Sequence, residues 1–75
     1  MKKIASKEDI EDLMMEYIDT PDFIMSDNKG YWFIQVKNVT RQEMSKYLRK
    51  QKKRFQFTYR IGSAAMGKVS LNIYP

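Results

Sequence analysis

The spacing of the apolar residues changes along this chain from a helical period to strict alternation, and the same change then happens a second time. A period of 3.6 residues buries one side of a helix, whereas alternation buries one face of a strand. Two such cycles in 75 residues predict the element order α-β-β-α-β-β. This order leaves few ways to build a core, because two helices must cover the single sheet that four strands can form.

The first helix is expected to cover residues 7–19. Ser6 and Asp9 are spaced as a capping box, in which each side chain binds the backbone N–H of the other residue. Pro21 ends the helix, because proline lacks a backbone donor and restricts the residue before it. The apolar face of this helix consists of Ile10, Leu13, Met14, Tyr17 and Ile18.

A β-hairpin is predicted over residues 22–37. Aromatic and β-branched residues lie on either side of residues 26–30, which are rich in turn formers. Side chains of the second strand alternate between the two faces of the sheet. We expect the aliphatic-rich set to point inward and the other set outward, that is, Trp32, Ile34 and Val36 against Tyr31, Phe33, Gln35 and Lys37.

A second helix is expected over residues 40–53 and a second hairpin over residues 55–74. Thr40 and Glu43 form a better capping box than the first one. In the last third of the chain, an apolar residue at every second position predicts two strands, with residues 62–67 as their loop. The apolar positions are Met44, Tyr47 and Leu48 in the helix, and Phe55, Phe57, Tyr59, Ile61, Val69, Leu71 and Ile73 in the strands.

These elements predict a single α+β domain over residues 1–75, with a four-stranded, mainly antiparallel sheet and both helices packed on one face.

The chain has no cysteine and no histidine, which excludes disulfides, thiolate or imidazole metal sites, and catalysis by Ser-His-Asp or Cys-His groups. The carboxylates of Asp12, Glu16 and Asp19 are interpreted as a solvated helix face. We therefore expect no enzyme activity, no cofactor and no metal. The lack of cysteine and of a long apolar run favours a cytoplasmic protein outside the membrane.

One string in the second hairpin has the appearance of a nucleotide-binding motif. Residues 62–68 fit the phosphate-binding pattern G-x-x-x-x-G-K. Val69 stands where that motif needs a hydroxyl group, and a strand-like segment follows where the motif needs a helix. We therefore interpret these residues as a hairpin loop.

Charge is distributed unevenly between the two halves of the chain. Residues 1–28 carry three lysines against eight acidic residues, net −5, whereas residues 29–75 carry eleven basic residues against Glu43 alone, net +10. Seven basic residues lie between positions 40 and 54, where their mutual repulsion destabilises the helix. This pattern predicts a helix face that binds nucleic acid. The residues expected to contact phosphates are Arg41, Lys46, Arg49, Lys50, Lys52, Lys53 and Arg54, extended by Arg60, Lys68 and Lys37.

Two kinds of nucleic acid are compatible with this surface. If the outer face of the sheet is open, Tyr31 and Phe33 can stack on unpaired bases, which favours RNA or single strands. If the helix enters a groove of duplex DNA, the side chains able to read base edges are Gln42, Ser45 and Arg49.

Two alternatives do not involve nucleic acid. The chain is alternatively a protein-binding inhibitor or adaptor, of the small phage type, that docks through its acidic first helix, Met15 and exposed aromatics, or through a sheet edge. A homo-oligomer that covers the outer sheet face with a second copy is the other alternative.

The element order, with Ile18 and Asp19 leading through Asp22 into Phe23, is similar to the core of the LAGLIDADG homing endonucleases, which lay a sheet on DNA. The glycines of that motif are missing, and the chain is too short for a full unit of that family. Nuclease activity is therefore not carried over from the resemblance.

Overall fold

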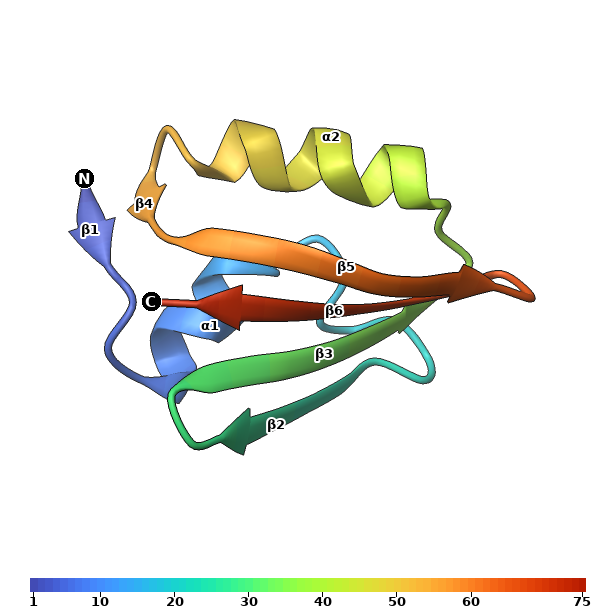
Figure 1. The fold of residues 1–75 in the computed structure, drawn as a ribbon, viewed down its shortest axis with the longest axis horizontal. Coiled ribbons are helices and arrows are strands. Elements are labelled where there is room, and N and C mark those ends of the chain that lie inside the picture. Colours follow the sequence, from blue (N-terminus) through green and yellow to red (C-terminus); the bar gives the residue numbers. More distant parts are fainter.

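The computed structural model describes all 75 residues and confirms the predicted α+β class and element order (Figure 1). Four strands form one antiparallel sheet in the order β2-β3-β6-β5, and two further short strands form a small parallel pair. The elements are β1 Lys2–Lys3, α1 Lys7–Leu13, β2 Ile24–Asn28, β3 Tyr31–Lys37, α2 Arg41–Gln51, β4 Phe55–Gln56, β5 Thr58–Ala65 and β6 Lys68–Tyr74.

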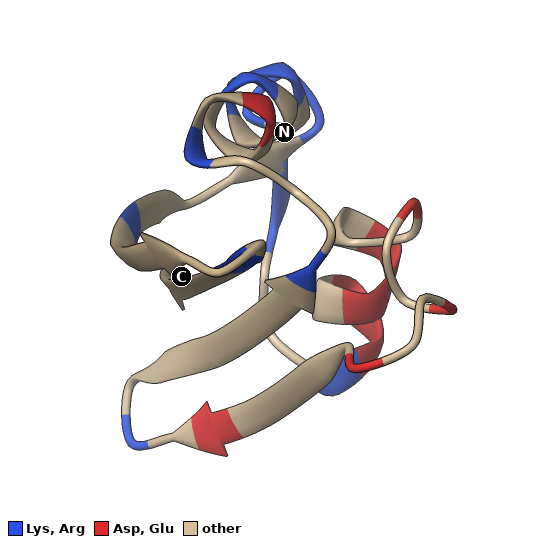
Figure 2. Ribbon diagram, turned by 90° about the vertical axis from the view of Figure 1, so that its right-hand side faces the viewer, with Lys and Arg blue, Asp and Glu red and all other residues tan.

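Both helices cover the same face of the sheet, so the molecule has two layers (Figures 1 and 2). The inward set predicted for β3 is confirmed, because Ile34 and Val36 are fully buried and Trp32 packs against the core. Register pairs Ile34 with Leu71 and Val36 with Val69, which aligns the apolar positions of β3 and β6 on this face. Buried side chains of the two helices, and of the residue that follows α1, complete the core on this face. They are Ile10, Leu13, Met14, Met44, Tyr47 and Leu48.

Helix α1 is shorter than predicted, since it ends at Leu13 rather than at residue 19. The hydroxyl of Tyr47 donates a hydrogen bond of 2.6 Å to the carbonyl oxygen of Leu13. This is the oxygen that the amide of Tyr17 would need to continue the helix, and that amide binds the carbonyl oxygen of Met14 instead. The hydroxyl of Tyr47 in α2 therefore binds the carbonyl oxygen at which the helical hydrogen-bond pattern of α1 ends. Residues 14–19 form successive turns.

Both hairpin turns are tighter than predicted. The strands run on through residues expected to be loops, and the turns contain only Lys29-Gly30 and Met66-Gly67. The three residues Gly30, Met66 and Gly67 have positive φ angles, as tight hairpin turns require. Residues 26–28 and 62–65 belong to the strands because polar and small side chains are acceptable where a strand is exposed to water. A register shift between Ile61 and Ser63 places the extra residue, Gly62, in a β-bulge.

The short parallel pair of β1 and β4 was absent from the sequence-based prediction. Lys2 lies opposite Phe55, and the amide of Lys2 donates to the carbonyl oxygen of Arg54 over 3.1 Å. Two-residue strands are too short to show any periodicity, so the sequence carries no signal for them.

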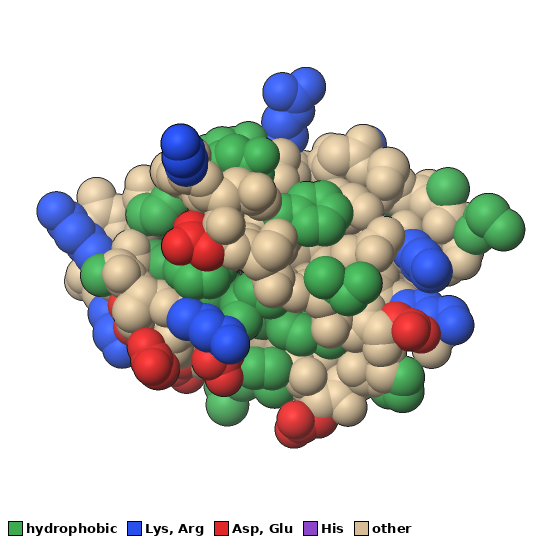
Figure 3. All heavy atoms as spheres, turned by 90° about the horizontal axis from the view of Figure 1, so that it is seen from below, with side chains coloured by type: hydrophobic (Ala, Val, Ile, Leu, Met, Phe, Trp, Pro, Cys, Tyr) green, Lys and Arg blue, Asp and Glu red, His purple; other side chains and the backbone are tan.

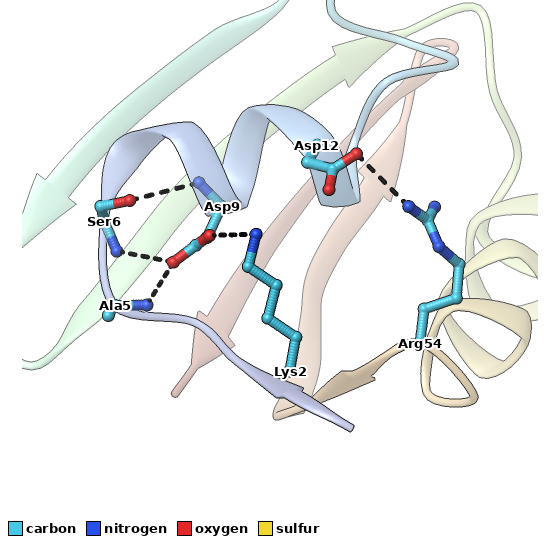
Figure 4. Close-up of polar contacts among 6 residues, drawn as sticks. All are labelled: Lys2, Ala5, Ser6, Asp9, Asp12 and Arg54. Atoms are coloured by element: carbon cyan, nitrogen blue, oxygen red, sulfur yellow. Dashed lines mark hydrogen bonds and ion pairs between the residues drawn. The ribbon is translucent and has the colours of Figure 1, made fainter.

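Asp9 fixes the start of α1 and connects it to β1 (Figure 4). Its carboxylate accepts hydrogen bonds from the amides of Ala5, at 2.8 Å, and Ser6, at 3.2 Å, and pairs with the ammonium of Lys2 at 3.0 Å. The predicted capping box of Ser6 and Asp9 is therefore confirmed. The amide of Ala5, followed by the ammonium of Lys2, holds the pKa of the Asp9 carboxyl below its ordinary value.

The lowered pKa of Asp9 predicts a specific loss of stability in acid. Because the folded-state pKa lies below the unfolded value, the stabilisation is fully present above a pH of about 4 and is lost as the pH falls through the folded-state pKa. Asp9→Asn should therefore show a smaller decrease in unfolding free energy between pH 5 and pH 2 than the unmodified protein, measured by urea denaturation. The matched control is Asp19→Asn, since the exposed Asp19 makes no ion pair or side-chain hydrogen bond. Identical acid dependence of the two variants would contradict the role of Asp9.

The bond between Tyr47 and Leu13 predicts a second stability difference. Burial raises the pKa of Tyr47 to about 12, so the hydroxyl remains a neutral donor at ordinary pH. Tyr47→Phe leaves the Leu13 carbonyl oxygen without this donor and should lower the unfolding free energy by about 1 to 2 kcal/mol in urea denaturation. Tyr31→Phe is the control, because the hydroxyl of Tyr31 has no hydrogen-bond partner, and its effect should be below about 0.5 kcal/mol. Equal effects of the two substitutions would show that the Tyr47 hydroxyl contributes nothing.

Candidate nucleic-acid interface

Helix α2 begins as predicted and carries its cations on the side away from the core. The capping box is confirmed, since the Thr40 amide donates to Glu43 Oε1 and the Glu43 amide donates to Thr40 Oγ1, both over 3.1 Å. Met44, Tyr47 and Leu48 are buried beneath the helix. Four cationic side chains on its outer side, or just after it, are exposed and have no ion pair and no hydrogen bond. These four, which we call the basic ridge, are Lys46, Arg49, Lys50 and Lys53.

The other three predicted cations of this region have partners within the molecule. Arg41 donates to the carbonyl oxygen of Ile61 over 3.0 Å, and the ammonium of Lys52 lies 5.5 Å from the ring centre of Tyr59. Both contacts lie at the boundary between α2 and β5. These contacts leave Arg41 and Lys52 exposed on the flank of the helix that faces the sheet edge.

Arg54 is a structural residue rather than a free cation. Its guanidinium pairs with Asp12 at 3.3 Å (Figure 4) and donates to Oε1 of the buried Gln51 at 3.0 Å. It also lies 5.2 Å from the ring centre of Phe55. Arg54 therefore joins the end of α2 to α1, a role that its sequence position among lysines did not reveal.

The acidic residues of the first half lie mainly around α1 and the segment that follows it, separate from the cations of α2 (Figure 2). One groove of about 300 Å³ is lined by both kinds of charge, with Glu16 and Glu43 beside Lys46 and Lys50. No carboxylate there lies within 4 Å of either ammonium. Acidic residues therefore reduce the positive potential on the side toward α1, and Arg49 and Lys53 are the ridge cations outside that groove.

The outer face of the sheet is uncovered. Strand register places Tyr31, Phe33 and Tyr74 on this face, and the rings of Tyr31 and Tyr74 lie 5.7 Å apart. Tyr74 was not among the predicted stacking residues, although the alternation of β6 could have placed it opposite the buried Leu71 and Ile73. The cations predicted to extend the footprint, Lys37, Arg60 and Lys68, are exposed on the same face.

A groove of about 560 Å³ lies between the start of α2 and the β5–β6 hairpin. Arg41 and Gln42 line it from the helix side, and residues 62–68 line it from the hairpin side. The string that resembles a phosphate-binding loop is therefore a β-hairpin, as interpreted, but most of it is strand and only Met66 and Gly67 form the turn. The groove brings Arg41 and Lys68 to one place, although they are 27 positions apart in the chain.

The three residues proposed to read a DNA groove are not equally available. Gln42 and Arg49 are exposed. Ser45 is half-buried, and its Oγ lies 3.3 Å from the hydroxyl oxygen of Tyr59. The Ser45 side chain is thus directed toward β5, which weakens the interpretation of α2 as a helix that reads bases in duplex DNA.

The division between structural and free cations can be tested by stability. Arg54→Ala removes the ion pair with Asp12 and the donor to the buried Gln51, so we expect the unfolding free energy to fall by about 1 kcal/mol. Lys53→Ala removes the same charge from the adjacent position, where the side chain has no partner. This substitution should change the unfolding free energy by less than about 0.5 kcal/mol. Urea denaturation at one salt concentration measures both, and equal losses would contradict the assignment.

Neither helix has the length and apolar character that crossing a membrane requires. Comparison with protein-family models, with curated proteins and with solved structures finds no match to this chain. The resemblance to LAGLIDADG homing endonucleases therefore depends only on the element order and the segment from Ile18 to Phe23, and the site must be interpreted from its own residues.

Proposed function

We propose that this chain is a small, non-enzymatic, cytoplasmic protein that binds nucleic acid through the basic ridge of α2. The observation that carries the proposal is that Lys46, Arg49, Lys50 and Lys53 are exposed and have no partner within the molecule. Phosphate groups are the common biological partners of such unpaired cations, because each contact releases a condensed counterion.

The energetics of the helix support this proposal. Like charges three or four positions apart destabilise a helix by a few tenths of a kcal/mol, and within α2 Lys46 forms such pairs with Arg49 and Lys50. The nearest acidic residues neutralise only one side of the ridge. An anionic polymer along the ridge would relieve this repulsion, whereas a solubilising surface would be expected to mix the two signs of charge.

The proposal predicts that reversing three ridge charges abolishes binding. With four phosphate contacts, the logarithm of the binding constant should fall with the logarithm of salt concentration with a slope between about −2 and −4. The combined variant Arg49→Glu, Lys50→Glu and Lys53→Glu should lose binding to single-stranded RNA, single-stranded DNA and duplex DNA in fluorescence anisotropy titrations at two salt concentrations.

The matched control carries Lys3→Glu, Lys7→Glu and Lys29→Glu. Both triple variants change the net charge from +5 to −1, so the control shares the loss of general attraction but leaves the ridge intact. It should retain a measurable part of the binding. Absence of binding to every polymer at low salt, or the same loss in both variants, would refute the proposed function.

A second candidate function is protein binding on another side of the molecule. Seen from the β2 side, hydrophobic side chains gather near the middle of the surface, with charged side chains around them (Figure 3). Met15 and Ile24 are 56% and 49% exposed, and β2 is an edge strand of the sheet. An inhibitor or adaptor that adds a partner strand at β2 would contact Ile24 there, whereas Met15 lies in the helix layer, where its sulfur is 3.8 Å from the Arg54 guanidinium. Such binding would be insensitive to salt and to the ridge reversals, so the same titrations with a protein partner separate the two functions.

A further inference from the structure

We propose that the outer face of the sheet is a stacking platform that makes the protein selective for single-stranded RNA. The inference rests on the proposed function, since it names the kind of nucleic acid that the ridge attracts. It depends on a separate set of residues, which allows it to be tested independently.

The aromatic side chains of this face lie next to one another. Tyr31 and Tyr74 face each other across β3 and β6 at 5.7 Å between ring centres. Phe33 lies two residues along β3 from Tyr31 and on the same face, which separates their Cα atoms by about 6.8 Å. All three are half-buried, so their rings remain accessible to solvent. Unpaired bases can stack on such rings, whereas the bases of a duplex already stack on each other.

The charge of this face complements a phosphate backbone. Register places Lys37, Arg60 and Lys68 on it, and no acidic residue of the four strands points to this side. Lys37 and Lys68 lie directly opposite each other, an arrangement that destabilises a sheet. Asp22, just before β2, pairs with Lys37 at 3.2 Å and leaves Lys68 without a counter-ion. A phosphate group near this pair would supply the missing negative charge.

Neutral hydrogen-bonding groups separate the aromatic and cationic side chains. Gln35, Ser70 and Asn72 all lie on the outer face and are only half-buried. Gln35 makes one hydrogen bond, to the Ser70 hydroxyl at 3.4 Å, and the Asn72 side chain makes none. Such amides and hydroxyls can bind base edges and the ribose 2′-hydroxyl, the group by which proteins distinguish RNA from DNA. This favours RNA over single-stranded DNA as the ligand.

The platform is continuous with the helix. Lys68 on the sheet and Arg41 at the start of α2 line the same groove. Gln42 also lines it, and Arg49 of the ridge lies about two helical turns further along α2. The ridge lies on the helix layer and the platform on the opposite face of the sheet, so a single strand stacked on the sheet would pass over the β5 edge through this groove to reach the ridge. The duplex has no equivalent route, because its paired bases do not reach the rings.

The experiment compares two double variants in binding to fluorescent single-stranded RNA and to duplex RNA. Tyr31→Ile with Tyr74→Ile keeps apolar, β-branched side chains in the strands but removes both rings, and should weaken binding to single-stranded RNA by about tenfold or more. Tyr31→Phe with Tyr74→Phe keeps the rings and should bind within about twofold of the unmodified protein. Circular dichroism melting of both variants confirms that each is folded.

The outcomes separate this inference from the proposed function. Support requires that the isoleucine pair weakens binding to single-stranded RNA but not to duplex RNA, while the ridge reversals abolish both. If the isoleucine pair binds single-stranded RNA normally and the ridge reversals still abolish it, the platform is wrong and the proposed function stands. Equal affinity for single-stranded DNA and RNA overturns the choice of RNA. Concentration-dependent dimers in sedimentation, lost with the isoleucine pair, would show that a second copy covers the face and would also overturn the inference.

Discussion

The burial of one sheet face under two helices is the interaction on which the rest of this structure depends. With 75 residues and no cysteine, the chain has one core, and that core lies between the two layers. Neither helix covers the other side of the sheet (Figures 1 and 2). The outer face is exposed to water, and apart from Ile24 on β2 it carries mainly polar, cationic and aromatic side chains.

The same two-layer arrangement decides which cations are free. The helices lie side by side on the sheet, and a residue between them can reach an opposite charge, as Arg54 reaches Asp12. The cations on the outer side of α2 make no ion pair, and most acidic residues lie around α1 and the turns after it (Figure 2). Exposed ion pairs contribute little in any case, so separation of charge costs the fold little stability. It leaves several unpaired cations on one surface, which an anionic partner can use.

The proposed binding surface combines two kinds of recognition. The ridge supplies attraction to phosphates that does not depend on sequence, while the aromatic rings of the sheet respond to whether bases are paired. Arg41 and Lys68 connect the two regions because the β5–β6 hairpin turns back beside the start of α2. Under this proposal the ridge would hold the strand and the sheet would distinguish single strands from duplexes, with the groove lined by Arg41 and Lys68 between the two surfaces.

Much of this structure could be predicted from the sequence, because periodicity and capping are local. The alternation of Ile34 and Val36 with Phe33 and Gln35 predicted which side of β3 is buried, and Thr40 with Glu43 predicted where α2 begins, and the structure confirms both. The overall charge of the second half and the outward position of its lysines followed from the same patterns.

Tertiary contacts decided the remainder. The stop of α1 at Leu13 coincides with a hydroxyl 34 positions away, and the structural role of Arg54 depends on a carboxylate 42 positions away. The placement of Arg41 and Lys68 along one groove required the β5–β6 hairpin to lie beside α2, and the contact of Tyr31 with Tyr74 required β3 to pair with β6. Local spacing determines which face a side chain occupies, whereas only the packing of distant segments determines which side chain lies beside it.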